Sequence, residues 1–361
     1  MRREIGSEFW MSSHHTGQAP SKSRATILAG KNHYLLSGRT AIDFIVKDYK
    51  AKEKLEKVML PSYCCSSMII PFLKNDVSVS FYDVIPDEQG HLSFRIDPEA
   101  EYDGILVMNY FGFAHPATEK LLDDSAAKSK LVIKDITHTL LSEREPDLRA
   151  DYTFGSIRKW FYMPDGAILQ KKGDFNLELP RTENREYVYN RLLALHLKTA
   201  YIHDGQVNKS RIFNYYKVCD EILAEKFSGF AMSKISRQVL RRTDLDRIIH
   251  DRRHNARVLI EKLGDLEQVE LIFREVAPHD VPLFVPILVK NGLRDELKKY
   301  LIQHNIFCPT HWNLSPLHEI SEQCKSVYQQ ELSLICDHRY NADDMRQIAN
   351  LIHKFFTQNT F

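Results

Sequence analysis

The sequence predicts an α/β fold in which a large domain, with a mostly parallel sheet flanked by helices, precedes a smaller α+β domain. Over roughly 150 residues, short apolar runs bounded by turn residues alternate with helical patterns, which is typical of βαβ units. Further along, one apolar strand lies among amphipathic helices. We therefore expect residues 1–245 to form an N-terminal arm and the large domain, and residues 246–361 to form the small domain.

The strands of the large domain are expected where apolar runs end at turn residues. A turn at Ser37 and Gly38 should lead into the first helix, since Ile42, Ile45 and Val46 recur at helical spacing after it. Because the ligands of parallel sheets bind at the carboxyl ends of the strands, site residues should follow the strands. The parallel strands are expected at residues 57–60, 77–81, 104–108 and 131–133.

Helical patterns dominate the second half of the sequence. Their period predicts a helical stretch from 181 to about 226, a helix over 244–263, a strand over 283–289, and helices over 293–304 and 342–356. The buried positions expected in the first stretch are Tyr187, Leu192, Leu195, Ala200, Phe213, Val218 and Leu223.

Composition excludes several classes of protein. Forty-nine Lys and Arg residues against 48 Asp and Glu leave a net charge of +1, so no broad field attracts nucleic acid or an anionic membrane. The apolar stretch 283–289 is too short to span a bilayer, and the six cysteines form neither a CxxC pair nor a cluster with metal-ligand spacing. We expect a cytoplasmic protein with reduced thiols, no bound metal, no nucleic-acid partner and no membrane association.

The N-terminal residues carry no targeting signal, because they lack an apolar segment. Residues 6–9, Gly-Ser-Glu-Phe, have the composition of a cloning remnant, which would make Met11 the natural start. We assign these residues no role.

The turn Ser37-Gly38-Arg39-Thr40 precedes the first predicted helix and is a candidate phosphate site. Free backbone N–H groups and the positive end of a helix attract an anion, and the Thr40 hydroxyl adds a donor. The alternative is an ordinary helix cap, since serine and glycine are common at helix starts.

Asp135 closes the apolar run KLVIKD, at the expected carboxyl end of a parallel strand. A carboxylate in this place can pair with a protonated heterocyclic nitrogen. In enzymes that use pyridoxal 5'-phosphate (PLP), such a pair keeps the pyridine ring charged, so that the ring withdraws electrons. The alternative is an aspartate that caps the following turn, which contains Thr137 and His138.

Ser156 and Lys159 form an SxxK arrangement at the end of a short predicted strand, in YTFGSIRKWFYMPDGAIL. A lysine amine can form a Schiff base with a carbonyl group and can then move a proton between carbon atoms. The serine, and the arginine next to the lysine, are suited to a phosphate group. Two alternatives stay open, because SxxK also occurs in acylating serine enzymes and a lysine beside aromatic residues is often a surface residue.

The phosphate-binding turn, the aspartate and the lysine follow one another along the chain, with Lys159 24 positions after Asp135. With their surroundings they resemble the DegT/DnrJ/EryC1/StrS family of sugar aminotransferases over most of the chain. The resemblance implies the PLP-dependent transferase fold of type I, PLP as cofactor, and a homodimer with active sites at the interface. The matching stretches are LLSGRTAI, KVMLPSYCCSSMIIPF, FYDVIPD, ILVMNYFGF, VIKDITHTLLS, SIRKWFYMPDGA, IFCPTHW and LSLICDHRYNADDMRQIANLI.

The resemblance also implies roles for individual residues. Lys159 would form the Schiff base with PLP, Asp135 would pair with the pyridine nitrogen, and His138 would lie near the ring substituents. The phosphate ligands that it implies are Gly38, Arg39 and Thr40, through the turn, and Ser156.

The sequence departs from the family pattern at several places. Phe154 stands where the family has a phosphate-binding serine, MPDGA replaces a glycine-rich stretch, and Cys65 aligns near the aromatic residue that stacks on the cofactor, which leaves Tyr63 as another candidate for stacking. These differences indicate a divergent branch. The candidate substrate-binding residues are Tyr110, after a predicted strand, and His311, in the segment PTHW.

The favoured hypothesis is an aminotransferase that moves an amino group from an amino acid, such as glutamate, to a keto sugar, expected to be nucleotide-linked and used in polysaccharide biosynthesis. A second hypothesis keeps PLP but changes the reaction to dehydration or another elimination on the sugar, because both reactions use the same electron sink. A third is a PLP-binding homologue without turnover, which the missing glycine-rich stretch favours and the presence of Lys159 and Asp135 opposes.

Overall fold

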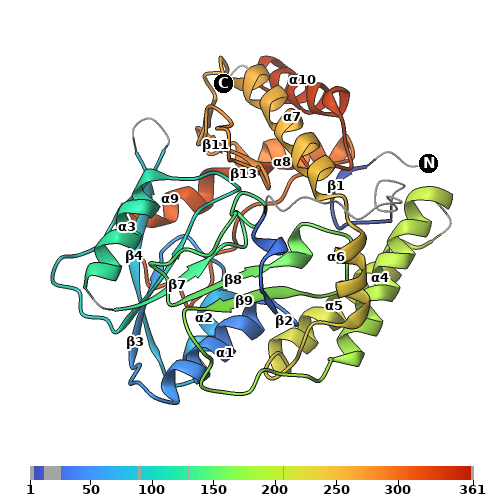
Figure 1. The fold of residues 1–361 in the computed structure, drawn as a ribbon. Coiled ribbons are helices and arrows are strands. Elements are labelled where there is room, and N and C mark those ends of the chain that lie inside the picture. Colours follow the sequence, from blue (N-terminus) through green and yellow to red (C-terminus); the bar gives the residue numbers. More distant parts are fainter. Residues whose placement is uncertain (1–3, 12–25, 88–90, 129, 206, 359–361) are drawn as a thin grey trace.

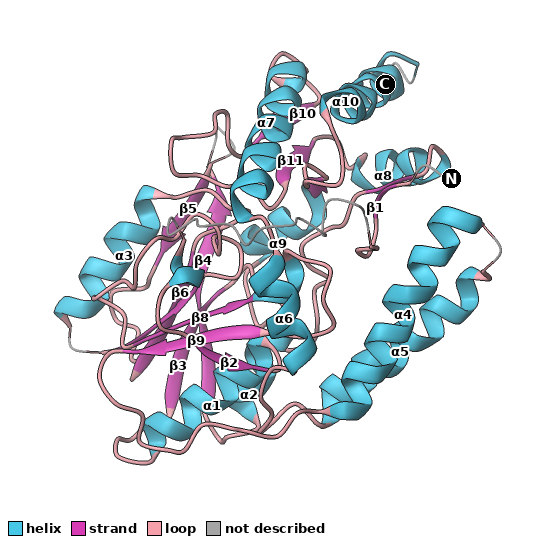
Figure 2. Ribbon diagram, turned by 45° about the vertical axis from the view of Figure 1, so that its right-hand side comes forward, coloured by secondary structure: helices cyan, strands magenta, loops and turns pink. Residues whose placement is uncertain are grey.

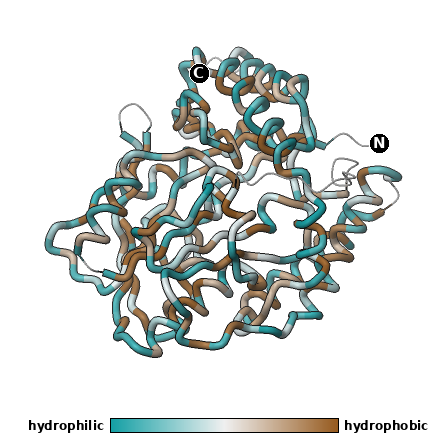
Figure 3. The backbone as a smooth tube through the Cα atoms, viewed as in Figure 1, coloured by the Kyte–Doolittle hydropathy of each residue, from teal (hydrophilic) through white to brown (hydrophobic). Residues whose placement is uncertain are grey.

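A large sheet flanked by helices forms one part of the molecule, and a smaller sheet with its own helices lies above it in Figure 1. This is a computed structural model, which describes residues 4–11, 26–87, 91–128, 130–205 and 207–358. Hydrophobic segments gather along the strands, and hydrophilic segments lie mostly on the outer loops and helices (Figure 3). The predicted fold class is confirmed, whereas the domain boundary at residue 245 stays a prediction.

Five neighbouring strands of the large sheet, β8, β7, β6, β3 and β4, run parallel, and the strand pairings at both edges are antiparallel. Each predicted parallel strand is present, although β4 and β7 continue further than their apolar runs. Asp135 is therefore the last residue of a strand. In order across the sheet the strands are β2 (His33–Leu35), β9 (Ala167–Lys171), β8 (Tyr152–Ser156), β7 (Leu131–Asp135), β6 (Gly104–Met108), β3 (Lys57–Pro61), β4 (Ser78–Pro86) and β5 (Leu92–Arg95).

Helices cover this sheet. α1 (Gly38–Lys50) and α2 (Ser66–Leu73) lie side by side below it in Figure 1, and α3 (Pro116–Ala127) packs against β6 and β7. α1 begins at the predicted place because the Ser37 side chain accepts a hydrogen bond from the Thr40 amide, as a serine N-cap does. Ile42 and Ile45 are buried on its inner face.

The smaller sheet is antiparallel and has the strand order β10 (Val269–Leu271), β11 (Val285–Val289) and β13 (Glu331–Leu334). The helices predicted around it are present. They are α7 (Leu245–Leu263), α8 (Arg294–Gln303) and α10 (Ala342–Gln358), to which the structure adds α9 (Glu322–Gln330).

The N-terminal residues, to which the sequence analysis assigned no role, are part of the fold. β1 (Ile5–Gly6) pairs in parallel with β12 (Ile306–Phe307), a strand 301 positions further along the chain. Ile5 and Trp10 are buried. A sequence pattern of two residues is too short to predict such a strand, because its partner supplies the pairing.

The helical stretch predicted over 181–226 is two helices, α4 (Arg185–Asp204) and α5 (Lys209–Glu225), which run side by side in Figure 2 and lead to α6 (Lys234–Arg242). α4 ends at Gly205, whose φ of 67° is left-handed. The predictions that Phe213 and Val218 are buried are wrong, because they are 63% and 36% exposed. The helical period is interrupted at Gly205. Buried positions counted from α4 at helical spacing therefore do not fall on the buried face of α5.

Within the described residues, no helix has the length and apolar character needed to cross a membrane.

The segment after β6 joins the two sheets. The carbonyl of Phe111 accepts a hydrogen bond from the Leu283 amide (2.7 Å), and that of Gly112 accepts one from the Val281 amide (3.1 Å). Gly112 has a φ of +95°, and a Cβ there would lie 2.6 Å from Leu283 N and closer still to the Val281 carbonyl. Only glycine fits this approach of two backbones.

We predict that Gly112→Ala lowers the free energy of unfolding by about 2–4 kcal/mol, because backbone strain and a backbone clash act together. Chemical denaturation measures the loss. Gly173→Ala is the matched control, since its φ is +90° but no atom lies within 4 Å of an added Cβ. An equal loss of unfolding free energy in both variants would show that the close approach of Gly112 to Leu283 contributes nothing to the cost of the substitution.

Candidate active site

A cavity of about 200 Å³ lies where the carboxyl ends of β7 and β8 meet the start of α1. It brings together most of the residues that the sequence nominated, although they are far apart along the chain. The nominated residues in its wall are Gly38, Arg39, Cys65, Asp135, His138, Ser156 and Lys159. Other residues of the wall are Ser37, Thr137, Phe154, Arg158 and Trp312.

Asp135 presents a buried carboxylate to this cavity. Its Oδ1 accepts a hydrogen bond from the Thr137 amide (2.7 Å). The Thr137 side chain also bonds to this carboxylate, and the carboxylate lines the cavity, where a ligand can reach it. Burial raises the pKa of the Asp135 carboxyl above its ordinary value, although the bonds from Thr137 and the charge of Lys159 oppose the shift. A cationic ligand atom would stabilise the ionised form.

His138 offers a donor to the same cavity. Its Nδ1 accepts a hydrogen bond from the Phe111 amide (3.1 Å), which leaves the proton of the neutral ring on Nε2. Nε2 is buried and has no hydrogen-bond partner among the described residues. Burial, together with Lys159 and His311, holds the pKa of His138 well below its ordinary value. The ring therefore stays neutral and can donate through Nε2.

The start of α1 offers backbone donors. The first amides of a helix have no acceptor within it. The Thr40 amide bonds to Ser37 Oγ and the Ala41 amide to the Ser37 carbonyl, so the amides of Gly38 and Arg39 remain for an anion. The structure does not bring Thr40 itself to the cavity, because its hydroxyl is buried and donates to the Phe227 carbonyl (2.8 Å).

Lys159 ends the short helix η3 (Ile157–Lys159), which follows β8. Its amine makes no hydrogen bond or ion pair with any described residue. Thr137 holds both sides of this turn: its Oγ1 accepts from the Ser156 amide (3.0 Å) and its carbonyl from Trp160 Nε1 (2.7 Å). The backbone around Lys159 is therefore fixed while the amine stays free.

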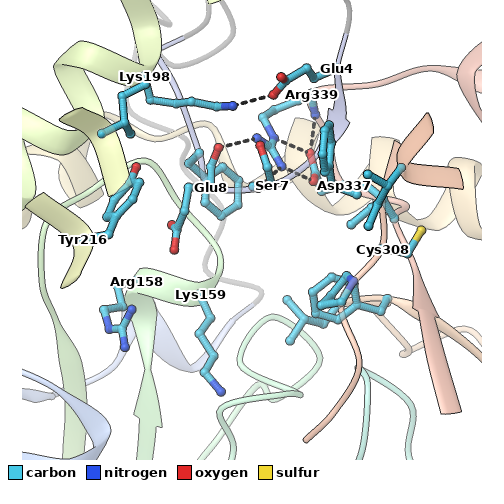
Figure 4. Close-up of a pocket in the computed structure, with 18 of the residues that line it drawn as sticks. Glu4, Ser7, Glu8, Arg158, Lys159, Lys198, Tyr216, Cys308, Asp337 and Arg339 are labelled. Atoms are coloured by element: carbon cyan, nitrogen blue, oxygen red, sulfur yellow. Dashed lines mark hydrogen bonds and ion pairs between the residues drawn. The ribbon is translucent and has the colours of Figure 1, made fainter. Parts of the chain in front are cut away.

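Lys159 and Arg158 also line a larger cavity of about 550 Å³ (Figure 4). Its wall combines the N-terminal segment, α4, α5 and the loop before α10. Arg158, which lines both cavities, makes no hydrogen bond or ion pair with the described residues, and its Nε is buried without a partner. An unpaired guanidinium between two cavities is suited to an anion.

Sequence reasoning missed the ionic residues of the larger cavity. Glu4 pairs with Lys198 (2.5 Å) and Lys209 (2.7 Å), and Glu8 pairs with Arg191 (2.6 Å). These pairs join residues 183 to 205 positions apart, which no local pattern predicts. The only local signal was two glutamates in a segment that also contains Ile5.

Three other nominated residues lie outside the smaller cavity. Tyr63 and Tyr110 are fully buried, and the Tyr110 hydroxyl donates to the Tyr63 carbonyl (2.8 Å). His311 lines the larger cavity, where its Nδ1 lies 2.8 Å from Ser333 Oγ. Among the described residues the aromatic side chain at the ring face of His138 is Trp312, with ring centroids 5.4 Å apart and planes 29° apart. Trp312 and Cys65 are thus better placed than Tyr63 to contact a ring in this cavity.

No cluster of three or more potential metal ligands occurs in the described part of the chain.

The described groups form a site that can hold a flat, polar, anionic ligand. A carboxylate, a neutral imidazole, a free amine and a helix N-terminus converge on one cavity. Each is the complement of a different chemical group: a protonated ring nitrogen, an oxygen acceptor, a carbonyl carbon and a phosphate.

We predict that Asp135→Asn stabilises the cofactor-free protein at pH 7 by about 1 kcal/mol. A raised carboxyl pKa means that the folded chain binds the proton more tightly than the unfolded chain, so stability falls as pH rises through this range and the ionised side chain is unfavourable at pH 7. Thermal unfolding from pH 4 to 8 measures it, with the exposed Asp124→Asn as control. A destabilised Asp135→Asn protein would contradict the prediction.

No protein-family model and no curated protein matches the sequence. Solved structures do match. The chain superposes on Helicobacter pylori PseC, an aminotransferase involved in the biosynthesis of pseudoaminic acid, with a TM-score of 0.68 and 12% identity over 99% of this chain and 100% of that chain. The chain superposes on the aminotransferase TlmJ from Streptoalloteichus hindustanus with a TM-score of 0.65 and 11% identity, over 95% of this chain and 93% of that chain. It superposes on DesI, determined in the presence of its TDP-sugar product, with a TM-score of 0.60 and 14% identity, over 97% of this chain and 93% of that chain. The chain therefore has the fold of these proteins, the type I fold of PLP-dependent transferases that the sequence predicted.

Proposed function

We propose that this protein is a PLP-dependent aminotransferase that moves an amino group from an amino acid, expected to be glutamate, to a keto sugar, expected to be nucleotide-linked. The observation that carries the proposal is the convergence of Asp135, His138, Lys159 and the start of α1 on one cavity. The shared fold with solved aminotransferases supports it.

The residues present fit the cofactor group by group. The Asp135 carboxylate, which lines the cavity, would pair with a protonated pyridine nitrogen, and His138 Nε2, which has no partner among the described residues, would donate to the ring oxygen. The free amine of Lys159 would form the Schiff base. The phosphate would be held by the Gly38 and Arg39 amides and by the Ser156 hydroxyl, with Arg158 as a further cation.

Bound PLP supplies an electron sink for negative charge that develops on a substrate carbon. Ionised Asp135 would keep the ring nitrogen protonated, which offsets the unfavourable burial of the carboxylate. The Lys159 amine would act as the base that takes the proton from the substrate carbon and as the acid that returns a proton. Thr137 fixes the turn, so that this amine starts from a defined position.

The larger cavity is the proposed entrance for substrates, because Lys159 lines both cavities. Its volume of about 550 Å³ lies within the range of sites for small organic ligands. The TDP-sugar product named for DesI, which shares the fold, supports a sugar substrate.

We predict that the protein with PLP gains a visible absorption band that glutamate converts to the absorption of pyridoxamine phosphate. Lys159→Ala should lose the band, whereas Lys298→Arg, which changes another lysine of the larger cavity, should keep it. A keto sugar nucleotide should then restore the band. No band in the wild type would exclude any PLP function. A band that no amino donor converts would favour elimination chemistry or a homologue without turnover.

We predict that Arg158→Gln lowers the affinity for PLP about tenfold, because a charge-assisted bond to phosphate is lost. The affinity for pyridoxal, which lacks the phosphate, should change less than about twofold on the same reasoning. Absorbance titrations of the cofactor-free protein measure both constants. Arg241→Gln, an exposed residue of α6 outside both cavities, is the control. Equal losses for the two ligands would assign Arg158 a structural role only.

A further inference from the structure

The wall of the larger cavity carries an excess of positive charge. Eight basic side chains line it against three acidic ones, Glu4, Glu8 and Asp337. Glu4 and Asp337 are buried, and each is held in a tight ionic arrangement, the latter with Arg339 (2.7 Å). Glu8 differs from both, because its side chain is 45% exposed.

Glu8 belongs to a segment whose backbone is fixed on both sides. β1 pairs with β12, Trp10 is buried, and the guanidinium of Arg339 donates to the Glu8 carbonyl (3.2 Å) while lying 4.3 Å from the Trp10 ring centroid. The side chain of Glu8 points into the cavity above Arg158 and Lys159 (Figure 4). The carboxylate can therefore change its partner by side-chain rotation alone.

The partner of Glu8 is a pre-positioned arginine. Arg191 is 5% exposed, stacks at 4.5 Å from the Tyr216 ring centroid, and keeps a buried Nε without a partner among the described residues. Only its terminal nitrogen bonds to Glu8, at 2.6 Å. The protein around the cavity partly desolvates the exposed Glu8 carboxylate, which opposes its ionisation, but the charges of Arg191 and Arg158 outweigh this and lower the pKa of Glu8. An anion in this place is thus strongly favoured.

We propose that Arg191 binds an anionic group of the substrate, a carboxylate or a phosphate, and that Glu8 is an exchangeable counter-ion that occupies this position until the substrate displaces it. This assignment rests on the proposed function, because that function places the substrate beside Lys159. The buried arginine provides the binding energy, and the exposed carboxylate keeps the guanidinium paired when the cavity is empty, since an unpaired buried charge is costly. The glutamate also excludes weakly binding anions.

The test is the affinity of the PLP-loaded protein for two unreactive probes, measured by titration calorimetry. Glutarate represents the carboxylates of an amino donor, and uridine diphosphate represents the diphosphate of a sugar nucleotide. Glu8→Gln should raise the affinity for at least one probe about tenfold, because the competing carboxylate is gone. Arg191→Gln should lower the affinity for the same probe about tenfold or more. Glu186→Gln, an exposed position of the same helix as Arg191, makes the same charge change and should have no effect.

Each outcome decides one question. If Glu8→Gln raises the affinity for glutarate alone, Arg191 binds the amino donor. If it raises the affinity for uridine diphosphate alone, Arg191 binds the acceptor. Equal affinities in Glu8→Gln and Glu186→Gln, or unchanged binding in Arg191→Gln, would overturn the proposal. If Arg191→Gln does not fold, the comparison of Glu8→Gln with Glu186→Gln decides alone. The probes carry neither an amino nor a keto group, so a failure here is separate from a failure of PLP to attach at Lys159.

Discussion

The hydrogen bonds of Thr137 are the interactions on which the candidate site depends. Its amide holds Asp135, its hydroxyl accepts from the Ser156 amide, and its carbonyl accepts from the Trp160 indole. These bonds connect the end of β7 to both sides of the turn that carries Lys159. The acid and the amine thereby keep a defined separation although no bond joins them. A site built at strand ends needs such a connection, because the strands alone do not orient the loops that follow them.

The part of the site that follows this sheet edge could be predicted from the sequence. Asp135 ends a recognisable strand, Lys159 lies three residues after the end of another, and Gly38 begins a helix with a serine cap, so local patterns locate all three. The type I fold brings them together at one edge. Tyr63 and Tyr110 follow strands in the same way but turn into the core, since a strand end does not determine on which side the next side chain lies.

The larger cavity could not be predicted, because tertiary contacts alone create it. Glu4 and Glu8 gain partners on α4, and β1 exists only through β12. In isolation these residues have the composition of an unstructured end. The exposure of Phe213 has the same origin: it lines the cavity, and the helical period counted from α4 does not continue into α5.

The central claim is that the smaller cavity binds PLP with its ring nitrogen at Asp135 and its carbonyl carbon at Lys159. A crystal structure of the protein with PLP tests this most directly. We expect continuous electron density between Lys159 Nζ and the cofactor, and an Asp135 oxygen about 2.7–3.0 Å from the pyridine nitrogen. Density for PLP elsewhere, or a pyridine nitrogen that faces away from Asp135, would contradict the claim.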